Sequence, residues 1–123
     1  MATRVLVVDD HDDARELLTL IMETHGYSVI TAANGREAVE AAGRSQPDAI
    51  IMDLFMPEMD GYEAAHALKA DAALSSIPIV AYTARSNPPE IDGGVFAACC
   101  VKPCHPAELL QTLERVLAAR PGV

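Results

Sequence analysis

Short runs of apolar residues, many of them β-branched, recur along the chain and predict five strands. The runs at residues 4–8 and 49–52 are nearly free of polar residues, whereas a strand with one face in water would alternate between polar and apolar positions. These two strands are therefore expected to be covered on both faces, as in a sheet that lies between layers of helices. The predicted strands cover residues 4–8, 27–31, 49–52, 77–82 and 97–101.

Between the strands, apolar residues at helical spacing predict amphipathic helices. Asp12 or Asp13 can cap the first of these helices, and Gly26 is expected to stop it. Asn34 is the predicted N-cap of the second helix, and Pro106 suits the first position of the last helix.

The alternation of strands and helices implies parallel strands joined by right-handed crossovers. Five such units predict a three-layer, doubly wound α/β fold in a single domain over residues 1–123. The fourth helix is expected to be short or irregular, because residues 85–95 contain two prolines and two glycines. All five strands then end at the same edge of the sheet.

Residues that can bind phosphate or metal ions follow four of the five strands, namely Asp9, Asp10, Asp53, Thr83 and Lys102. Three carboxylates in one pocket repel each other and favour a bound cation, and oxygen ligands suit Mg²⁺. A carboxylate beside Mg²⁺ can attack a phosphoryl group, while Lys102 supplies positive charge and Thr83 a hydrogen bond. The chain has no glycine-rich phosphate loop, so another protein is the expected phosphoryl donor.

Composition narrows the classes of partner. The formal charge of −9 argues against a nucleic-acid-binding surface, which needs a basic patch. No apolar run approaches the ~20 residues that span a bilayer, so membrane insertion is not expected. Three cysteines, two of them adjacent, do not suggest a disulfide framework, and a cytoplasmic location is the expectation.

As a set, these residues resemble the receiver domains of two-component response regulators, the CheY-like family. The resemblance covers essentially the whole chain, and its motifs are specific only in combination, since an Asp-Asp pair alone is a weak signal. The matching motifs are Val7-Val8-Asp9-Asp10-His11, Met52-Asp53-Leu54-Phe55-Met56-Pro57-Glu58-Met59-Asp60-Gly61, Thr83-Ala84 and Val101-Lys102-Pro103.

The resemblance implies a flavodoxin-like fold with strand order 2-1-3-4-5. It also implies that Asp53 is the phosphoacceptor. Asp9 and Asp10 would hold Mg²⁺ together with Asp53, and the backbone carbonyl of Phe55 would be a further ligand.

The same resemblance implies a switch rather than a conventional enzyme. Thr83 would be the switch hydroxyl, and Lys102 would contact the phosphoryl group. The donor would be a phosphohistidine on a histidine kinase or a histidine phosphotransfer protein, and the domain would catalyse its own dephosphorylation. A downstream protein or a lost output domain would respond to the changed surface, and a homodimer is a further option.

Two departures from the family pattern leave an alternative open. Cys99 stands three positions before Lys102, where the family usually carries Tyr or Phe, although Tyr82 is a candidate substitute. Residues 85–95 are shorter than usual and belong to the usual output face. The alternative is an interaction module that keeps the fold but signals without phosphorylation.

Two enzyme or cofactor functions are disfavoured. A phosphohydrolase acting through an aspartyl intermediate would need a general acid where Phe55 stands. A flavin-binding flavodoxin is disfavoured because the first strand ends in acids, which repel phosphate.

The histidines are expected to have no role in the site. His11 could tune the acidic pocket, but it is interpreted as a loop residue at the helix entry because nothing else in the sequence pairs with it. His25, His66 and His105 are interpreted as surface residues without partners.

The cysteines are expected to be small core residues. Adjacent strand residues point to opposite faces of a sheet, so Cys99 and Cys100 would not converge on one metal ion. Cys104 is given the same structural interpretation.

Overall fold

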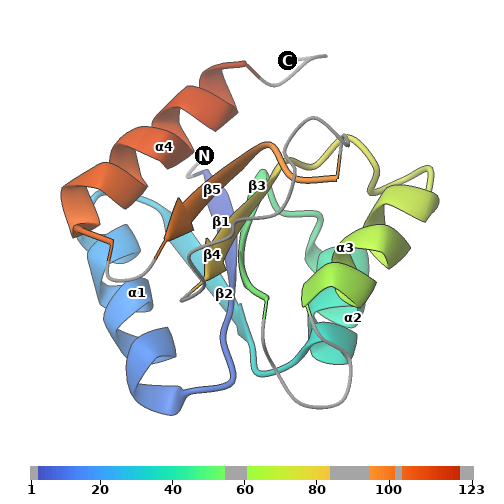
Figure 1. The fold of residues 1–123 in the computed structure, drawn as a ribbon, viewed down its shortest axis with the longest axis horizontal. Helices are drawn as coiled ribbons and strands as arrows, with labels where there is room; N and C mark the ends of the chain where they lie inside the picture. Colours follow the sequence, from blue (N-terminus) through green and yellow to red (C-terminus); the bar gives the residue numbers. More distant parts are fainter. Residues whose placement is uncertain (1–2, 55–60, 84–94, 102–103, 120–123) are drawn as a thin grey trace.

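The computed structural model describes residues 3–54, 61–83, 95–101 and 104–119. Figure 1 shows a twisted sheet with helices on both faces. The described residues form five strands and four helices. In chain order these are β1 (Arg4–Val8), α1 (Asp12–Thr24), β2 (Ser28–Ala32), α2 (Gly35–Ser45), β3 (Ala49–Asp53), α3 (Gly61–Ala70), β4 (Ile79–Thr83), β5 (Ala98–Val101) and α4 (Pro106–Ala118).

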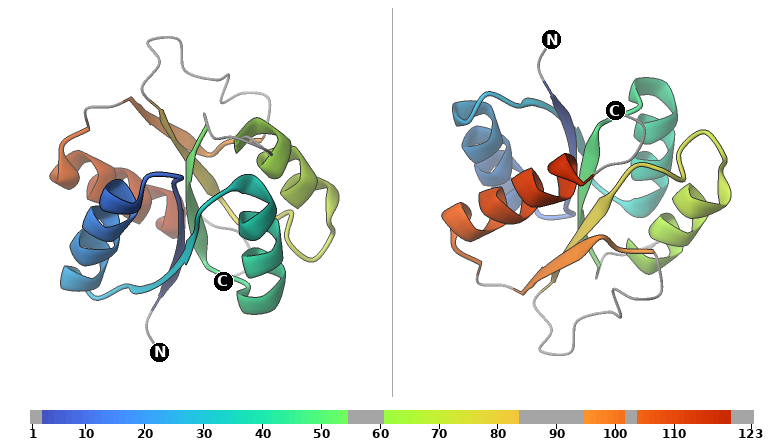
Figure 2. Two further views of the ribbon diagram at one scale, coloured as in Figure 1. Left: turned by 90° about the horizontal axis from the view of Figure 1, so that it is seen from below. Right: turned by 90° about the horizontal axis from the view of Figure 1, so that it is seen from above.

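The five strands pair in parallel in the order β2-β1-β3-β4-β5. Because every strand runs in the same direction, all five end at one edge of the sheet. Figure 2 shows the crossovers, with α1 and α4 on one face and α2 and α3 on the other. The predicted three-layer α/β fold and its strand order are confirmed.

Alternating side chains divide the core into two clusters, one on each side of the sheet. Along β3, Ile50 and Met52 pack into the cluster that includes residues of α2 and α3. Ala49 and Ile51 pack into the cluster that includes residues of α1 and α4. Both faces of the strand are therefore buried, which explains why its sequence is a continuous apolar run.

Helix α2 begins with reciprocal side-chain hydrogen bonds. Asn34 Oδ1 accepts a hydrogen bond from the Glu37 N–H at 2.9 Å. In return, Glu37 Oε1 accepts one from the Ala33 N–H at 3.2 Å. The predicted N-cap at Asn34 is confirmed. The arrangement resembles a capping box, except that Glu37 binds the N–H of Ala33 rather than that of the N-cap.

Helix α4 also begins with a side-chain cap. His105 is its N-cap, and His105 Nδ1 accepts a hydrogen bond from the Ala107 N–H at 3.1 Å. Pro106 occupies the first turn, as predicted. His105 is exposed, as predicted, but the interpretation that it has no partner is wrong. The same holds for the exposed His25, whose Nδ1 lies 3.0 Å from the Ile21 carbonyl oxygen.

Helix α1 begins without a side-chain cap. Its N-cap is His11, whose backbone is extended and whose side chain makes no capping hydrogen bond. The prediction that Asp12 or Asp13 caps this helix is wrong, because both acids lie inside its first turn. Gly26 follows the end of the helix with a positive φ of 91°, which confirms its predicted role as a stop.

Several predicted strand boundaries differ from the structure by one or two residues, and one predicted helix lies almost entirely beyond the described residues. Strand β4 begins at Ile79 rather than at Ile77, since Pro78 has no N–H to donate to a sheet. The short or irregular helix predicted for residues 85–95 falls, except for Val95, outside the described residues.

Candidate functional site

Two buried carboxylates meet because they follow paired strands. Asp9 comes directly after β1 and Asp53 ends β3, and the preceding residues Val8 and Met52 pair in the sheet. Asp9 is 0% and Asp53 4% exposed. Asp10 lies beside them, with its side chain 23% exposed. The structure thus brings the three predicted acids into one pocket.

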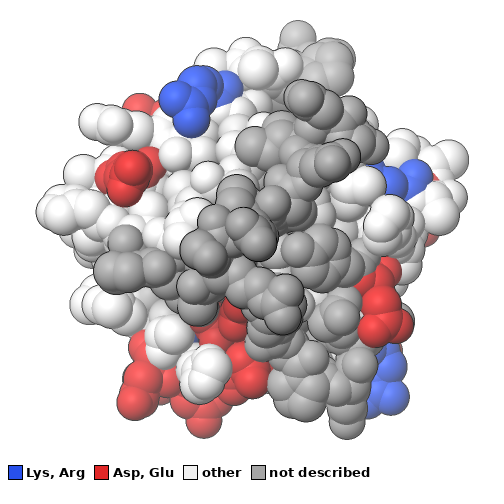
Figure 3. All heavy atoms as spheres, viewed as in Figure 1, with Lys and Arg blue, Asp and Glu red and all other residues white. Residues whose placement is uncertain are grey.

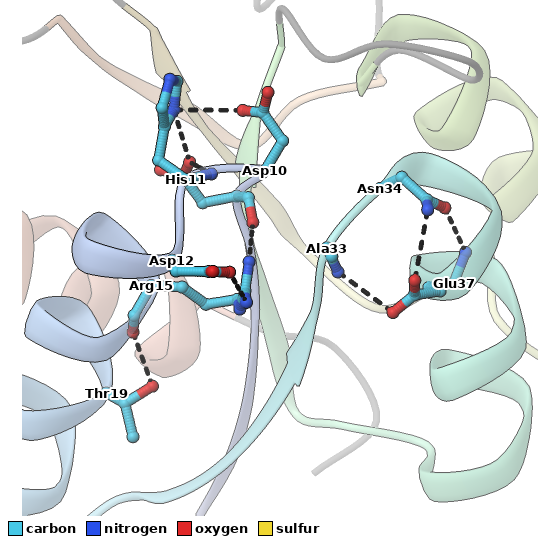
Figure 4. A network of polar contacts seen from close by, with 9 residues as sticks. Asp10, His11, Asp12, Arg15, Thr19, Ala33, Asn34 and Glu37 are labelled. Carbon is cyan, nitrogen blue, oxygen red and sulfur yellow. Dashed lines mark hydrogen bonds and ion pairs between the residues drawn. The ribbon is translucent and has the colours of Figure 1, made fainter.

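His11 completes this pocket. Its Nδ1 lies 3.2 Å from Asp9 Oδ1 and 3.1 Å from Asp10 Oδ1 (Figure 4). The His11 backbone N–H donates a hydrogen bond to Asp9 Oδ1 at 2.9 Å. One ligand atom from each of His11, Asp9, Asp10 and Asp53 lies within 4.8 Å of the others. His11 lies at the entry to α1, as predicted, but the interpretation that it has no partner is wrong. Its position directly after the acid pair was the signal for its place in the pocket.

The donor atoms of the pocket fit a divalent cation. Carboxylate oxygens are the ligands that Mg²⁺ and Mn²⁺ prefer. Asp10 Oδ1 is buried and accepts no hydrogen bond from the described residues, although the His11 ring lies beside it. A buried carboxylate oxygen without a donor is costly, and a bound cation would remove that cost.

Arg15 fixes the loop between β1 and α1. Its Nη1 donates a hydrogen bond to the backbone carbonyl of Asp9 at 2.7 Å. Its Nη2 pairs with the Asp12 carboxylate, and Figure 4 shows this network. Because Arg15 binds the main chain of Asp9, it holds the loop in place and leaves the Asp9 carboxylate to the pocket.

Gly61, the first residue of α3, supports the end of β3. Its N–H donates a hydrogen bond to the Leu54 carbonyl at 3.0 Å. A Cβ at this position would lie 2.5 Å from the Asp53 carbonyl oxygen and 2.7 Å from the Leu54 Cα. Such contacts are too short for a side chain to be accommodated, so any other residue would displace the backbone that carries Asp53.

Tyr82 connects the pocket to the region between α1 and α4. It pairs with Asp53 across β3 and β4 and is half-buried. Burial is the largest cause that raises the pKa of Tyr82, followed by the charges of Cys104, Asp9, Cys100 and Asp53. Tyr82 is therefore a packed strand residue that responds to the acids of the pocket. It lines a cavity of about 240 Å³ with Ala14, Leu17, Leu18, Ile21, Cys104, Pro106 and Leu109.

The cysteines lie in or beside the core as free thiols. Cys99 packs against the cluster on the α2 and α3 side, and Cys100 lies in the cluster on the α1 and α4 side, as predicted from their adjacency. Burial raises the pKa of Cys104 to about 12, helped by a hydrogen bond with Cys100 and by the charges of Cys100 and Glu108. A thiol so rarely ionised is a poor nucleophile, which favours the structural interpretation.

The remaining predicted site residues are only partly described. Thr83 ends β4 opposite Val101, so its backbone lies at the edge of the sheet that carries the acids. The side chain of Thr83, together with Phe55 and Lys102, lies outside the described residues. Their roles stay predictions.

The acidic character of the pocket extends to the surface around it. Figure 3 shows acidic side chains gathered at the lower edge of the molecule, over the start of α1. Asp12 and Asp13 lie in the first turn of that helix. Negative charge concentrated on one side raises the local concentration of cations.

Residues 5–114 match the family described as the response regulator receiver domain. The chain is a response regulator receiver domain. Receiver domains of this kind belong to two-component signal transduction systems.

Known proteins resemble this receiver domain over different shares of their length. The protein PilH of Pseudomonas aeruginosa is 34% identical over 118 residues, which cover 94% of this chain and 98% of PilH. The response regulator MprA of Mycolicibacterium vanbaalenii is 36% identical over 120 residues, which cover 95% of this chain and 51% of MprA. The receiver domain thus spans nearly all of PilH but about half of MprA and of several other curated relatives.

Solved receiver structures superpose closely on this one. The chemotaxis protein CheY4 of Vibrio cholerae has a TM-score of 0.88 at 35% identity, over 94% of this chain and 99% of CheY4. The receiver domain of a sensor histidine kinase from Pseudomonas aeruginosa has a TM-score of 0.88 at 29% identity, over 97% and 100% of the two chains. That structure contains a magnesium ion coordinated in its active-site cleft. Among the described residues of the present chain, no helix combines the length and apolarity required to cross a bilayer.

Proposed function

We propose that this receiver domain accepts a phosphoryl group on Asp53 from a phosphohistidine. The donor would be carried by a histidine kinase or a histidine phosphotransfer protein. The observation that carries the proposal is the meeting of Asp53 with Asp9 and Asp10 at the carboxyl edge of a parallel sheet. In open α/β sheets this edge is where ligands bind.

Asp9, Asp10 and Asp53 would hold Mg²⁺, with the backbone carbonyl of Phe55 as a further ligand. The carboxylate oxygens of the pocket support this assignment. So does the magnesium ion in the related receiver domain of the sensor histidine kinase. When bound, Mg²⁺ supplies positive charge that offsets the negative charge of the reacting oxygens.

The proposed reaction moves one phosphoryl group between two side chains. An Asp53 carboxylate oxygen forms a bond to phosphorus while the bond from phosphorus to the donor's histidine nitrogen breaks, and the nitrogen keeps the electron pair. Water later cleaves the acyl phosphate, which restores the Asp53 carboxylate and releases phosphate. The domain is in this sense a signalling phosphoacceptor that promotes its own phosphorylation and dephosphorylation.

The proposed switch follows from the charge that phosphorylation adds, about −1.5 to −2 units. Thr83 would donate a hydrogen bond to the phosphoryl group, and Lys102 would pair with it. The loops after β4 and β5 would move toward these new partners and change the nearby surface. A downstream protein or an output domain would bind that surface in the cytoplasm. The changed surface would also be able to stabilise a homodimer.

The test is intact mass after incubation with acetyl phosphate, with Mg²⁺ or with a chelator. Asp53→Asn removes the acceptor, and Asp13→Asn changes an acid in the first turn of α1 as the matched control. The parent and Asp13→Asn should gain one phosphoryl group that requires Mg²⁺. Asp53→Asn should gain none.

One observation favours a second function, a phosphorylation-independent interaction module. Cys99 is half-buried in β5 and stands where the family usually places its switch aromatic residue. This function predicts no added mass on the parent under any condition. It would then be pursued through partners that bind the unmodified domain.

A further inference from the structure

Two helices of this receiver domain begin at a histidine N-cap, and only one of the two imidazoles caps its helix. His105 Nδ1 accepts a hydrogen bond from the Ala107 N–H. His11 makes no such bond, and its Nδ1 lies 3.2 Å from Asp9 Oδ1 and 3.1 Å from Asp10 Oδ1. The His11 side chain is therefore directed to the acidic pocket.

The spacing of these atoms matches that of neighbouring ligands around one cation. Ligands at right angles in an octahedral site with bonds of ~2.0–2.1 Å lie roughly 3 Å apart. The two distances from His11 Nδ1 fall close to this value. The atoms contributed by His11, Asp9, Asp10 and Asp53 all lie within 4.8 Å of one another. This limit exceeds by less than an ångström the ~4.1 Å that separates opposite ligands of such an ion.

The main chain already holds part of this arrangement in place. The His11 N–H donates to Asp9 Oδ1 at 2.9 Å, and Arg15 donates to the Asp9 carbonyl at 2.7 Å. These bonds fix the positions of Asp9 and of the His11 backbone relative to each other. The His11 side chain is 71% exposed, so its ring can adjust by tenths of an ångström without disturbing the core.

We propose that His11 Nδ1 is a nitrogen ligand of the cation held by Asp9, Asp10 and Asp53, and that it raises the affinity of this site for borderline transition metals. Imidazole suits Ni²⁺, Zn²⁺ and related ions, whereas Mg²⁺ prefers oxygen ligands. The neutral tautomer with its proton on Nε2 leaves Nδ1 available to coordinate. The inference rests on the cation site of the proposed function and adds a second class of metal to it.

The test compares the affinities of Mg²⁺ and Ni²⁺ by titration calorimetry. His11→Ala removes the proposed ligand, and His105→Ala is the matched control because it removes an imidazole at another helix N-cap. His11→Ala should weaken Ni²⁺ binding about tenfold or more and Mg²⁺ binding by less than about twofold. His105→Ala should leave both affinities unchanged.

Two further measurements distinguish coordination by the His11 nitrogen from other effects of the substitution. In the parent, Zn²⁺ should shift the ¹⁵N resonance of His11 Nδ1 strongly, whereas Mg²⁺ should not. His11→Asn, which offers an amide oxygen, should keep Mg²⁺ binding but not recover Ni²⁺ binding. Circular dichroism of each variant verifies that the fold is retained.

Distinct results would overturn the inference. Equal losses of Mg²⁺ and Ni²⁺ affinity in His11→Ala would assign His11 a structural role. Equal gains of Mg²⁺ and Ni²⁺ affinity in this variant would show that His11 is a counter-ion that competes with the metal. Unchanged affinities would exclude His11 as a ligand. Asp9→Asn separates the two proposals, because if it leaves Mg²⁺ binding intact, the cation site of the proposed function fails as well.

Discussion

The four described helices begin at the same edge of the sheet, and their starts fall into two groups. At α1 and α3, His11 and Gly61 serve the pocket, one through its ring and the other by leaving room for the backbone. At α2 and α4, Asn34 and His105 bind N–H groups of their own helices. We call these the pocket-side starts and the capped starts. The same residue type, histidine, occurs in both groups, so position in the fold decides its role.

The largest losses of stability and of phosphorylation rate are expected from a substitution at the pocket-side start of α3. Gly61→Ala would place a Cβ 2.5 Å from the Asp53 carbonyl oxygen, and overpacking of this kind typically costs about 1–3 kcal/mol. Urea unfolding should show this loss, and phosphorylation by acetyl phosphate should slow because Asp53 is displaced.

Gly43→Ala is the matched control for this prediction. Gly43 lies in α2, and a Cβ there would meet nothing within 4 Å. This substitution should stabilise the domain by up to about 1 kcal/mol, since alanine favours a helix interior over glycine. Similar unfolding free energies for the two variants would contradict the close approach at Gly61.

The capped start of α2 should affect stability but not the pocket. Asn34→Ala removes the hydrogen bond to the Glu37 N–H and should cost about 1 kcal/mol of unfolding free energy. Asn34→Ser keeps a capping oxygen and should recover most of this loss. Mg²⁺ affinity should stay at the parent value in both variants, and a clear change in it would remove the distinction between the two groups.

Loss of the histidine side chain should reduce stability more at the start of α4 than at the start of α1. His105→Ala should cost roughly 0.5–1 kcal/mol of stability, because the Ala107 N–H loses its partner. His11→Ala should change the stability of the metal-free domain by less than about 0.5 kcal/mol, because its exposed side chain caps nothing. Denaturant unfolding of both variants with a chelator present checks this order, and the reverse order would break the comparison.

The smallest change in stability is expected from a substitution of Tyr82, which lies between α1 and α4. Its pKa is raised above 10.0, so the folded domain keeps the phenol proton at a pH where the unfolded chain has released it. Stability should therefore fall as the pH rises above that value, and Tyr82→Phe should lose less stability than the parent between pH ~9 and ~11.

Mg²⁺ provides an internal control for this titration. The charges of Asp9 and Asp53 contribute to the raised pKa of Tyr82, so a bound cation should move the phenolate absorbance titration to lower pH. Tyr27, whose pKa is raised by burial and by Glu114, should not respond. Equal responses of the two tyrosines would show that the pocket does not act on Tyr82.

The acidic pocket could be predicted from sequence, whereas the use of His11 could not. Asp9 and Asp53 directly follow buried apolar runs, and the parallel order of the strands then brings them together. His11 and His105 each stand between a strand and a helix, and the acid pair before His11 is the one sequence feature that separates them. That feature alone does not show which way either ring turns. The backbone is extended at both helix starts, so the difference lies in the side chains. The His11 ring contacts the acids, and the His105 ring accepts a hydrogen bond from the Ala107 N–H.

The parallel direction of the strands also gives the fold an electrical polarity. The aligned peptide groups of a helix place about half a positive elementary charge at its start, and all four described helices start at the edge where the strands end. The backbone therefore creates a field that favours negative charge at this edge, whichever side chains are present. Substitutions there can alter which anionic group is accommodated, but the field itself follows from the topology and is beyond the reach of a single mutation.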